Sequence, residues 1–252
     1  MPLRDILKAL QRREIDVEEA EKRIKILTID EIEGIVKLDV GREQRRKIPE
    51  VILAEYKDTK TLLQIINRKI SDTDKVILSR VKEEQFEEIM KMKKDYNIIS
   101  SSNKRIVVIK KNTKEKKVGK VGIVAAGTSD IPLAEEVKIL TEEFGCNTKL
   151  IVDSGISGIH RTFSAAKKMI QEDVDVVVAI AGMEGILPII LSTLTDIPVI
   201  GLPASIGYGL GGDGITALLT MLQTCTPGLT VVNIDNSVGA AAAAALIARR
   251  RK

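Results

Sequence analysis

VDVVVAIAGMEG, residues 174–185, joins a run of strand-forming residues to a carboxylate flanked by two glycines. A continuous run of Val and Ile is typical of a parallel strand that is covered on both faces of its sheet. Glu184 follows this run closely, and a carboxylate is costly to bury without a partner. The stretch therefore predicts a central strand whose end delivers Glu184 to a cleft at the end of the sheet.

Four further runs of this kind lie on either side of the first. A helix-length segment follows each run, so strands alternate with helices from residue 121 onward. This alternation predicts an α/β, doubly wound domain with a five-stranded parallel sheet. The predicted strands are VGIVAA (121–126), TKLIVD (148–153), VDVVVAI (174–180), IPVIGL (197–202) and LTVVNI (229–234).

Glycines, hydroxyls and carboxylates follow the predicted strands. Because ligands bind outside the carboxyl ends of the strands in such sheets, these segments predict one binding cleft. They are GTSD (127–130), DSGISGIHR (153–161), AGMEG (181–185), PASIGYGLGGDG (203–214) and DNSVGA (235–240).

The first 110 residues predict a smaller α/β domain that begins with a helix. Asp16 to Glu19 has the spacing of a capping box before an amphipathic run that ends at Leu27. Beyond it, β-type runs are separated by amphipathic helices. The runs lie at 50–54, 75–79 and 105–110, and the helices lie around 59–69 and 82–94.

The composition changes near residue 120. Residues 1–120 hold 30 of the 39 Lys and Arg residues, whereas residues 121–252 hold 15 of the 18 glycines. We interpret this break as a boundary between a small domain at 1–110 and a catalytic domain at 121–252, joined by a Lys-rich linker at 111–120. An aromatic content of 2% argues against a stacking platform for single-stranded nucleic acid.

Other classes of protein are disfavoured by the same sequence. Two cysteines make no disulfide framework, and no secretory signal is evident, so we expect a cytoplasmic location. Charged residues and a proline interrupt the apolar stretch from residue 174, which therefore predicts no membrane span. With a single histidine in the chain, we expect no imidazole-rich zinc site and assign no metal ligands.

GTSD, residues 127–130, has two interpretations. Backbone N–H groups between a strand and a helix favour a phosphate, whereas Ser129 or Asp130 can equally cap the first helical turn. The loop lacks the lysine of a P-loop and the spacing of GxGxxG, so neither an ATPase nor an ordinary dehydrogenase is indicated. A lone histidine such as His160 is more often structural, although the neighbouring Arg161 suits a phosphate.

Two further side chains are candidates for chemistry. The glycines beside Glu184 allow a ligand to approach closely, which suits general acid–base work, and the alternative is a carboxylate that complements a helix dipole. Cys225 precedes the Pro227-Gly228 pair that ends the fourth predicted helix of the domain. The residues alone favour a buried, structural cysteine there, because a helix carboxyl end does not stabilise a thiolate.

Six segments, in this order, resemble the LarB family, the carboxylase/hydrolases of nickel-pincer nucleotide biosynthesis. The catalytic domain of that family is related to aminoimidazole ribonucleotide (AIR) carboxylase, PurE, so the resemblance implies a flavodoxin-like, PurE-like sheet. LDVGREQRRKIPEVILAE, residues 38–55, is similar to the amino-terminal region of the same family. The six segments are AAGTSDIPLAEE (125–136), GIHR (158–161), AGMEGILP (181–188), LPASIGYG (202–209), ALLTMLQTCTPG (217–228) and VVNIDNSVGAA (231–241).

The resemblance implies a substrate and roles for residues. Nicotinic acid adenine dinucleotide would be carboxylated at ring C5 with CO2 or bicarbonate, then cleaved to AMP and pyridinium-3,5-biscarboxylic acid mononucleotide. Cys225 would bond to the ring, and Glu184, or else Asp130, would remove the C5 proton. No tightly bound cofactor is implied, although Mg2+ could assist the hydrolysis. Substrate contacts are implied for Gly127, Thr128, Ser129, Asp153, His160, Arg161, Gly182, Met183, Ser205, Tyr208, Asn233 and Asp235.

The resemblance also implies an assembly and leaves two other functions open. Family octamers lead us to expect a homo-oligomer, with the alanines at 240–245 packed closely between subunits. A purine-type AIR carboxylase or mutase shares the fold, but Ile186 stands where that family has a histidine. A non-catalytic nucleotide- or RNA-binding module is suggested by the basic first half, although we expect no nucleic-acid partner.

Overall fold

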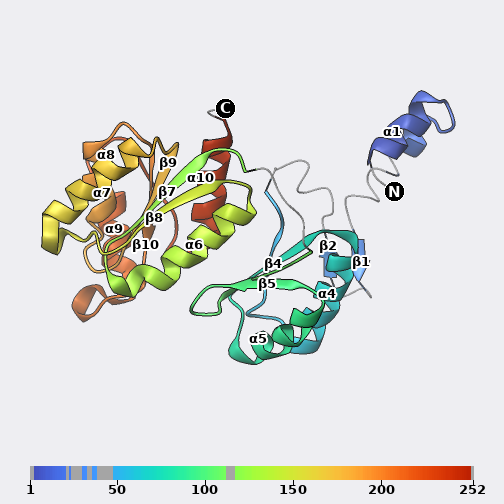
Figure 1. Cartoon of the computed structure of the whole chain (residues 1–252), viewed down its shortest axis with the longest axis horizontal. Helices are drawn as coiled ribbons and strands as arrows, with labels where there is room; N and C mark the ends of the chain where they lie inside the picture. Colours follow the sequence, from blue (N-terminus) through green and yellow to red (C-terminus); the bar gives the residue numbers. More distant parts are fainter. Residues whose placement is uncertain are drawn as a thin grey trace.

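The computed structural model describes residues 3–20, 23, 30–32, 36–38, 48–111 and 117–250. These residues form two units, with the last helix of the chain standing in the larger one (Figure 1). The predicted helix at 16–27 is described only in part, and there the Asp16 side chain caps it by accepting a hydrogen bond from Glu19 N. Its remainder lies outside the described residues. Within the part that the structure describes, no helix is long and apolar enough to cross a membrane.

The larger unit is built on the predicted five-stranded parallel sheet. Its strand order is β11-β10-β9-β7-β8, which is the flavodoxin-like order when the strands are numbered within the unit. All six residues of β9 are buried, as the run of Val and Ile predicts. The strands are β7 (Lys120–Ala125), β8 (Asn147–Ile151), β9 (Val176–Ala181), β10 (Val199–Pro203) and β11 (Leu229–Val231).

Helices cover both faces of this sheet. Val176, Val178 and Ile180 of β9 pack in one cluster with α6 and α10, and the intervening residues pack in a second cluster with the other helices. This alternation follows from the period of two in a strand. One face carries α6 (Ile131–Glu143) and α10 (Ser237–Arg250), and the other carries α7 (Ile159–Gln171), α8 (Leu187–Leu194) and α9 (Ile215–Leu222).

The alanine-rich helix α10 corrects one expectation. Its alanines at 240, 241, 244, 245 and 248 are fully buried against the sheet and α6 of the same chain. Small side chains let the two helices approach closely, but the contact lies within the subunit. This alanine face is therefore not a surface for packing between subunits.

The smaller unit has a four-stranded sheet in the order β3-β4-β6-β5, in which only β3 and β4 are parallel. One face of this sheet packs on α4 and α5. The sequence predicts β3, β4, β6 and both helices but misses β5, whose segment NIIS holds only two apolar residues. The elements are β3 (Val51–Leu53), α4 (Thr59–Asp72), β4 (Lys75–Ser79), α5 (Glu83–Met90), β5 (Asn97–Ser100) and β6 (Ile106–Lys110).

Three more described elements lie near the amino terminus. Helix α1 (Leu3–Gln11) precedes a short antiparallel pair, β1 (Asp30–Ile32) and β2 (Val36–Leu38). The sequence prediction includes none of the three.

The two units share a core. Ile77, Ile106 and Val108, on the second face of the small sheet, belong to the same buried cluster as the inner residues of α6 and α10. Both sheets therefore pack on this pair of helices, and the layers run from α4 and α5 through to α7, α8 and α9. Ion pairs add to the contact, because Lys110 and Lys75 of the small sheet both reach Glu143 at the end of α6.

Candidate active site

A cavity of about 460 Å3 opens at the carboxyl end of the large sheet. The loops after β7 and β9 form its two sides, and their helices, α6 and α8, leave toward opposite faces of the sheet. In doubly wound folds this switch point is where ligands bind. The residues that line the cavity are Ala126, Gly127, Ser129, Asp130, Gly155, Ile156, Ser157, Ala181, Gly182, Met183, Glu184, Ile186, Leu187 and Ile206.

Asp130 is the buried carboxylate of this cleft cavity. Its Oδ2 accepts a hydrogen bond from Gly127 N at 2.8 Å, so the side chain caps the turn at Thr128–Asp130 that leads into α6. Its Oδ1 is buried with no hydrogen-bond partner among the described residues. Burial raises the pKa of the Asp130 carboxyl, and the Gly127 N–H opposes this shift. Oδ1 is therefore a buried acceptor whose hydrogen-bonding capacity is unused among the described residues.

Glu184 lies on a tight turn directly after β9. The Gly182 carbonyl accepts a hydrogen bond from Gly185 N at 2.9 Å, and Gly185 has a φ of +67°, which glycine adopts without strain. Met183, at φ +46°, donates from its N–H to the carbonyl of Ile206. The Glu184 side chain is exposed. Glu184 therefore leaves the core and lines the cleft cavity, as the sequence predicts, whereas Asp130 is the carboxylate that is buried there.

Asp153, His160 and Arg161, which follow β8, do not line the cleft cavity. Arg161 Nη1 donates to the Asp153 carboxylate, so two predicted substrate contacts bind each other in this structure. His160 is exposed on the first turn of α7 and is not among the residues that line the cavity. Gly155, Ile156 and Ser157 are the part of this loop that reaches it.

Cys225 lies at the other end of the sheet. Helix α9 ends at Leu222 and β11 begins at Leu229, parallel to β10, so residue 225 precedes the amino end of its strand. Glu184 follows the carboxyl end of β9. The cysteine is exposed, which corrects the expectation of a buried thiol, whereas Cys146 is the buried cysteine. One chain by itself does not bring the Cys225 thiol to the cleft cavity.

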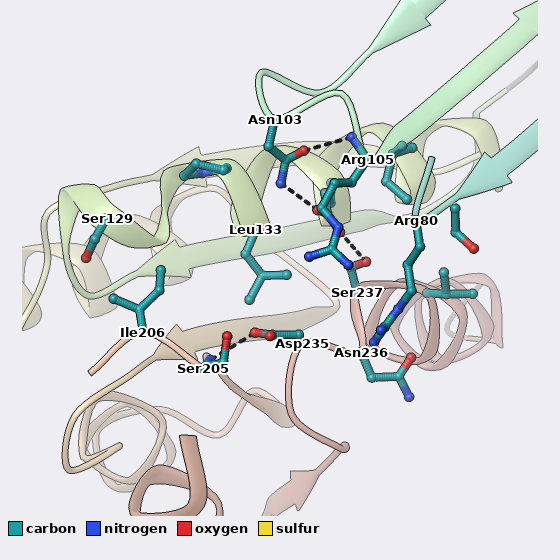
Figure 2. A pocket seen from close by; sticks show the side chains of 15 residues that line it. Arg80, Asn103, Arg105, Ser129, Leu133, Ser205, Ile206, Asp235, Asn236 and Ser237 are labelled. Atoms are coloured by element: carbon teal, nitrogen blue, oxygen red, sulfur yellow. Dashed lines mark hydrogen bonds between the residues drawn. The ribbon is translucent and has the colours of Figure 1, made fainter. Parts of the chain in front are cut away.

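A second cavity, of about 220 Å3, lies between the two units (Figure 2). Here Ser205 N donates to Asp235 Oδ1 at 2.9 Å, so two predicted substrate contacts meet in this interunit pocket. Arg80, Asn103 and Arg105 of the small unit line the same pocket. The sequence does not predict these three residues, because nothing in the order of the chain shows that the small unit reaches the large sheet.

The remaining predicted contacts line neither cavity. Thr128, Tyr208 and Asn233 are exposed, and Asn233 Oδ1 accepts a hydrogen bond from the next backbone N–H. Of the residues that the sequence predicts for the site, the structure gathers Gly127, Ser129, Asp130, Gly182, Met183 and Glu184 around the cleft cavity. Across the described ranges, no group of three or more His, Cys, Asp or Glu side chains could hold a metal ion.

Comparisons with known proteins match both units. A family model described as AIR carboxylase matches residues 120–252, and one described as a LarB/PurE-like N-terminal domain matches residues 29–111. A protein of Methanocaldococcus jannaschii, named only as uncharacterized, is 43% identical and covers 98% of this chain and 97% of its own length. The N5-carboxyaminoimidazole ribonucleotide mutase of Pyrococcus horikoshii is 34% identical over 48% of this chain and 67% of its own. The mutase of Thermotoga maritima is 28% identical over 50% of this chain and 74% of its own.

Proposed function

Because this chain belongs to the AIR carboxylase family and its first half matches a LarB/PurE-like N-terminal domain, we propose that it is a carboxylase of a pyridinium dinucleotide. The substrate would be nicotinic acid adenine dinucleotide, carboxylated at ring C5 and then hydrolysed to AMP and pyridinium-3,5-biscarboxylic acid mononucleotide. One observation carries the proposal: the cleft cavity holds two carboxylates, Glu184 and Asp130, and no histidine among its lining residues. Ile186 lines the cavity, and the resemblance aligns it with a histidine of the purine enzymes.

The proposed chemistry starts with a thiolate because a pyridinium ring is electron-poor and does not attack CO2. Addition of the Cys225 sulfur at C4 gives a dihydropyridine, whose C5 is nucleophilic like the β-carbon of an enamine. C5 forms a bond to CO2, a base then removes the C5 proton, and expulsion of the thiolate restores the aromatic ring. The sulfur is regenerated, and the net change is replacement of a ring proton by a carboxylate.

Glu184 is the base that we propose, with Asp130 as the second candidate. Glu184 stands on the turn between two glycines, where a flat ring can approach the carboxylate without meeting a side chain from residue 182 or 185. Asp130 has an unpartnered oxygen, but its raised pKa leaves a smaller fraction of the carboxylate ionised at a given pH than an ordinary Asp would have. An ionised group is needed to accept the C5 proton.

The thiol would come from a second copy of the chain. Cys225 lies at the amino end of its own sheet, but it is exposed and follows a helix with an apolar outer face. Ile215, Leu219 and Leu222, spaced by four and three residues along α9, are all more than half exposed. Such a stripe is typical of a surface that another chain covers. We therefore propose a homo-oligomer in which this face of one subunit reaches the cleft of another.

The test is an incubation of the protein with nicotinic acid adenine dinucleotide and bicarbonate. We expect AMP and a dicarboxylated mononucleotide, measured by mass spectrometry, and no product with Cys225→Ala. Cys146→Ala is the matched control, because Cys146 is buried against α10 and should keep the activity. Absence of the product from wild-type protein at every pH between about 6 and 9, where a thiol titrates, would reject the proposal.

A purine-type mutase is the second candidate, favoured by the similarity of the second half of the chain to the mutases of P. horikoshii and T. maritima. Turnover of N5-carboxyaminoimidazole ribonucleotide, measured with the same preparation, distinguishes it. This activity needs no thiol, so it would persist in Cys225→Ala. The small unit weighs against it, because the matched mutase segments cover about half of this chain.

A further inference from the structure

Two arginines from the small unit face the large unit across the interunit pocket. Ser79, the last residue of β4, pairs with Ile106, the first of β6, so Arg80 and Arg105 flank the end of this strand pair. The Arg105 carbonyl accepts a hydrogen bond from Val81 N at 3.0 Å, which holds the two segments together. Figure 2 shows both side chains directed toward the start of α10.

The carboxylates in this pocket are already engaged, whereas the guanidinium groups are largely available. Glu136 accepts hydrogen bonds from Asn103 Nδ2 at 2.8 Å and from Ser237 Oγ at 2.6 Å. Arg80 makes one long, exposed ion pair of 3.4 Å with Glu55. Among the described residues, no hydrogen bond or ion pair is found for the Arg105 guanidinium. The pocket therefore offers guanidinium N–H donors to an anionic ligand, beside two carboxylates that already accept hydrogen bonds, and the amino end of α10 adds a favourable dipole.

Arg80 is held in this position by a strained backbone. Its φ is +53°, in the left-handed region that glycine adopts freely and that costs free energy for a long side chain. Lys104, on the neighbouring turn, has φ +60° but pairs with Glu83 and does not line the pocket. Arg80 and Lys104 thus have the same backbone conformation and the same charge, but only Arg80 lines the pocket.

The interunit pocket adjoins the cleft cavity. Ser129 and Ile206 line both, so the two spaces lie on either side of these residues. A ligand with its reacting end beside Glu184 can extend past Ser129 toward the arginines. The smaller volume, about 220 Å3 against about 460 Å3, suits one end of a two-part ligand.

We propose that the interunit pocket binds the adenylate half of the dinucleotide, with Arg80 and Arg105 holding its phosphate. The small unit would then select a dinucleotide over a mononucleotide and would hold the adenylate half in place while ring C5 is carboxylated. The identity of the ligand rests on the proposed function, whereas the binding of a nucleoside phosphate at the two arginines does not.

The experiment is calorimetric titration of the full chain with AMP as the probe. We expect saturable binding to the wild type, weakened at least about tenfold by Arg105→Gln and by Arg80→Gly, since each removes a charge-assisted contact to the phosphate. Lys104→Gly is the control and should bind AMP as the wild type does. Thermal denaturation should show Arg80→Gly no less stable than the wild type, because glycine relieves the strain at φ +53°.

The outcomes separate this proposal from the proposed function. Absence of AMP binding to the wild type, or equal weakening by Lys104→Gly, would overturn the assignment of the pocket. Loss of AMP binding in the arginine variants, without any carboxylation of the dinucleotide by the wild type, would keep the pocket and reject the proposed reaction. Carboxylation with an unchanged KM for the dinucleotide in Arg80→Gly and Arg105→Gln would keep the reaction and reject the pocket.

Discussion

Asp130 and Glu184 are both carboxylates of one cleft, but their surroundings separate them. Asp130 is 3% exposed and has one oxygen without a partner, whereas Glu184 is exposed on its turn. A buried, incompletely bonded carboxylate lowers the stability of a fold, because ionising it there costs more than ionising it in water. Capping the turn does not require a buried carboxylate, so Asp130 lowers the stability of the protein more than a cap needs to. This is consistent with a residue that interacts with a ligand.

Asp130→Asn should stabilise the protein at neutral pH. The amide oxygen can still accept the hydrogen bond from Gly127 N, while the buried charge is removed. Burial raises the pKa of Asp130 in the folded state above its unfolded value, so the penalty is absent below the unfolded pKa and grows as the pH rises through the folded pKa. We expect a gain on the order of 1 kcal/mol at pH 7 that vanishes below about pH 4. Thermal denaturation of both proteins across this range measures it, and a variant less stable than the wild type at pH 7 would contradict it.

The positions of single residues follow from the sequence where the chain itself joins them to the end of a strand. Gly127, Asp130 and Glu184 each follow a predicted strand within a few positions, and all three line the cleft cavity. Cys225 follows a helix, so its position depends on where α9 ends and on the direction of the next strand. Neither the end of α9 nor the direction of β11 can be read from a pattern of residues. The resemblance to a family implies a role for Cys225 but does not say where in the fold the residue lies.

At the scale of elements, the loop after β9 is held against the loop after β10. A Cβ at residue 182 would lie 2.1 Å from the carbonyl oxygen of Ile206, so only glycine allows this approach. The close contact between the two loops allows Met183 N to donate a hydrogen bond to the Ile206 carbonyl oxygen, and this bond positions the turn that carries Glu184. Gly182, two residues before Glu184, is thus needed for packing as well as for access to the carboxylate.

Gly182→Ala should destabilise the protein and displace the Glu184 turn. Because the new methyl group meets backbone, which cannot rotate away, we expect a loss of about 1 to 3 kcal/mol in the free energy of unfolding. Gly212→Ala is the control, since nothing lies within 4 Å of a Cβ there and its φ is −55°. Urea denaturation of the two variants measures the difference. Equal stabilities would show that the β9 and β10 loops are not tightly opposed.

The sequence predicts best those elements whose apolar residues directly reflect how deeply the element is buried. The inner strands of the large sheet, β7, β9 and β10, are buried and mostly apolar because helices cover both of its faces, whereas the edge strands β8 and β11 hold polar residues and are only partly buried. Helix α10 shows the limit of such patterns. Its alanines predict close packing, but a row of small side chains does not show whether the partner belongs to the same chain, and here it is α6.

At the scale of the whole molecule, Glu143 joins the two units. Its side chain is 8% exposed, lies 2.5 Å from Lys110 Nζ and 3.9 Å from Lys75 Nζ, and stands at the end of the helix that both sheets cover. A carboxylate that pairs with two lysines from the other unit stabilises their relative placement. The interunit pocket depends on that placement, because five of its lining residues come from the small unit.

Glu143→Gln should therefore destabilise the protein strongly, since it removes the carboxylate that pairs with two poorly exposed lysines, Lys110 and Lys75. Removing one member of a buried ion pair costs about 3 to 5 kcal/mol, and we expect the lower end of that range. Glu83→Gln, which breaks the exposed pair with Lys104, should change the free energy of unfolding by less than about 0.5 kcal/mol. Guanidinium denaturation compares the two, and similar effects would mean that Glu143 does not hold the units together.

The placement of Cys225 and Glu184 at opposite ends of one sheet makes a prediction about the assembly. Cys225→Ala and Glu184→Gln should each be inactive in carboxylation. Refolded together in equal amounts, they should recover about a quarter of wild-type activity, because random mixing gives that share of sites an intact thiol from one chain and an intact carboxylate from another. Mixing Cys225→Ala with the double variant should recover nothing. If the first mixture also stays inactive although the subunits have exchanged, then the thiol and the carboxylate do not meet across a contact between subunits, and the proposed route through the sulfur fails for this protein.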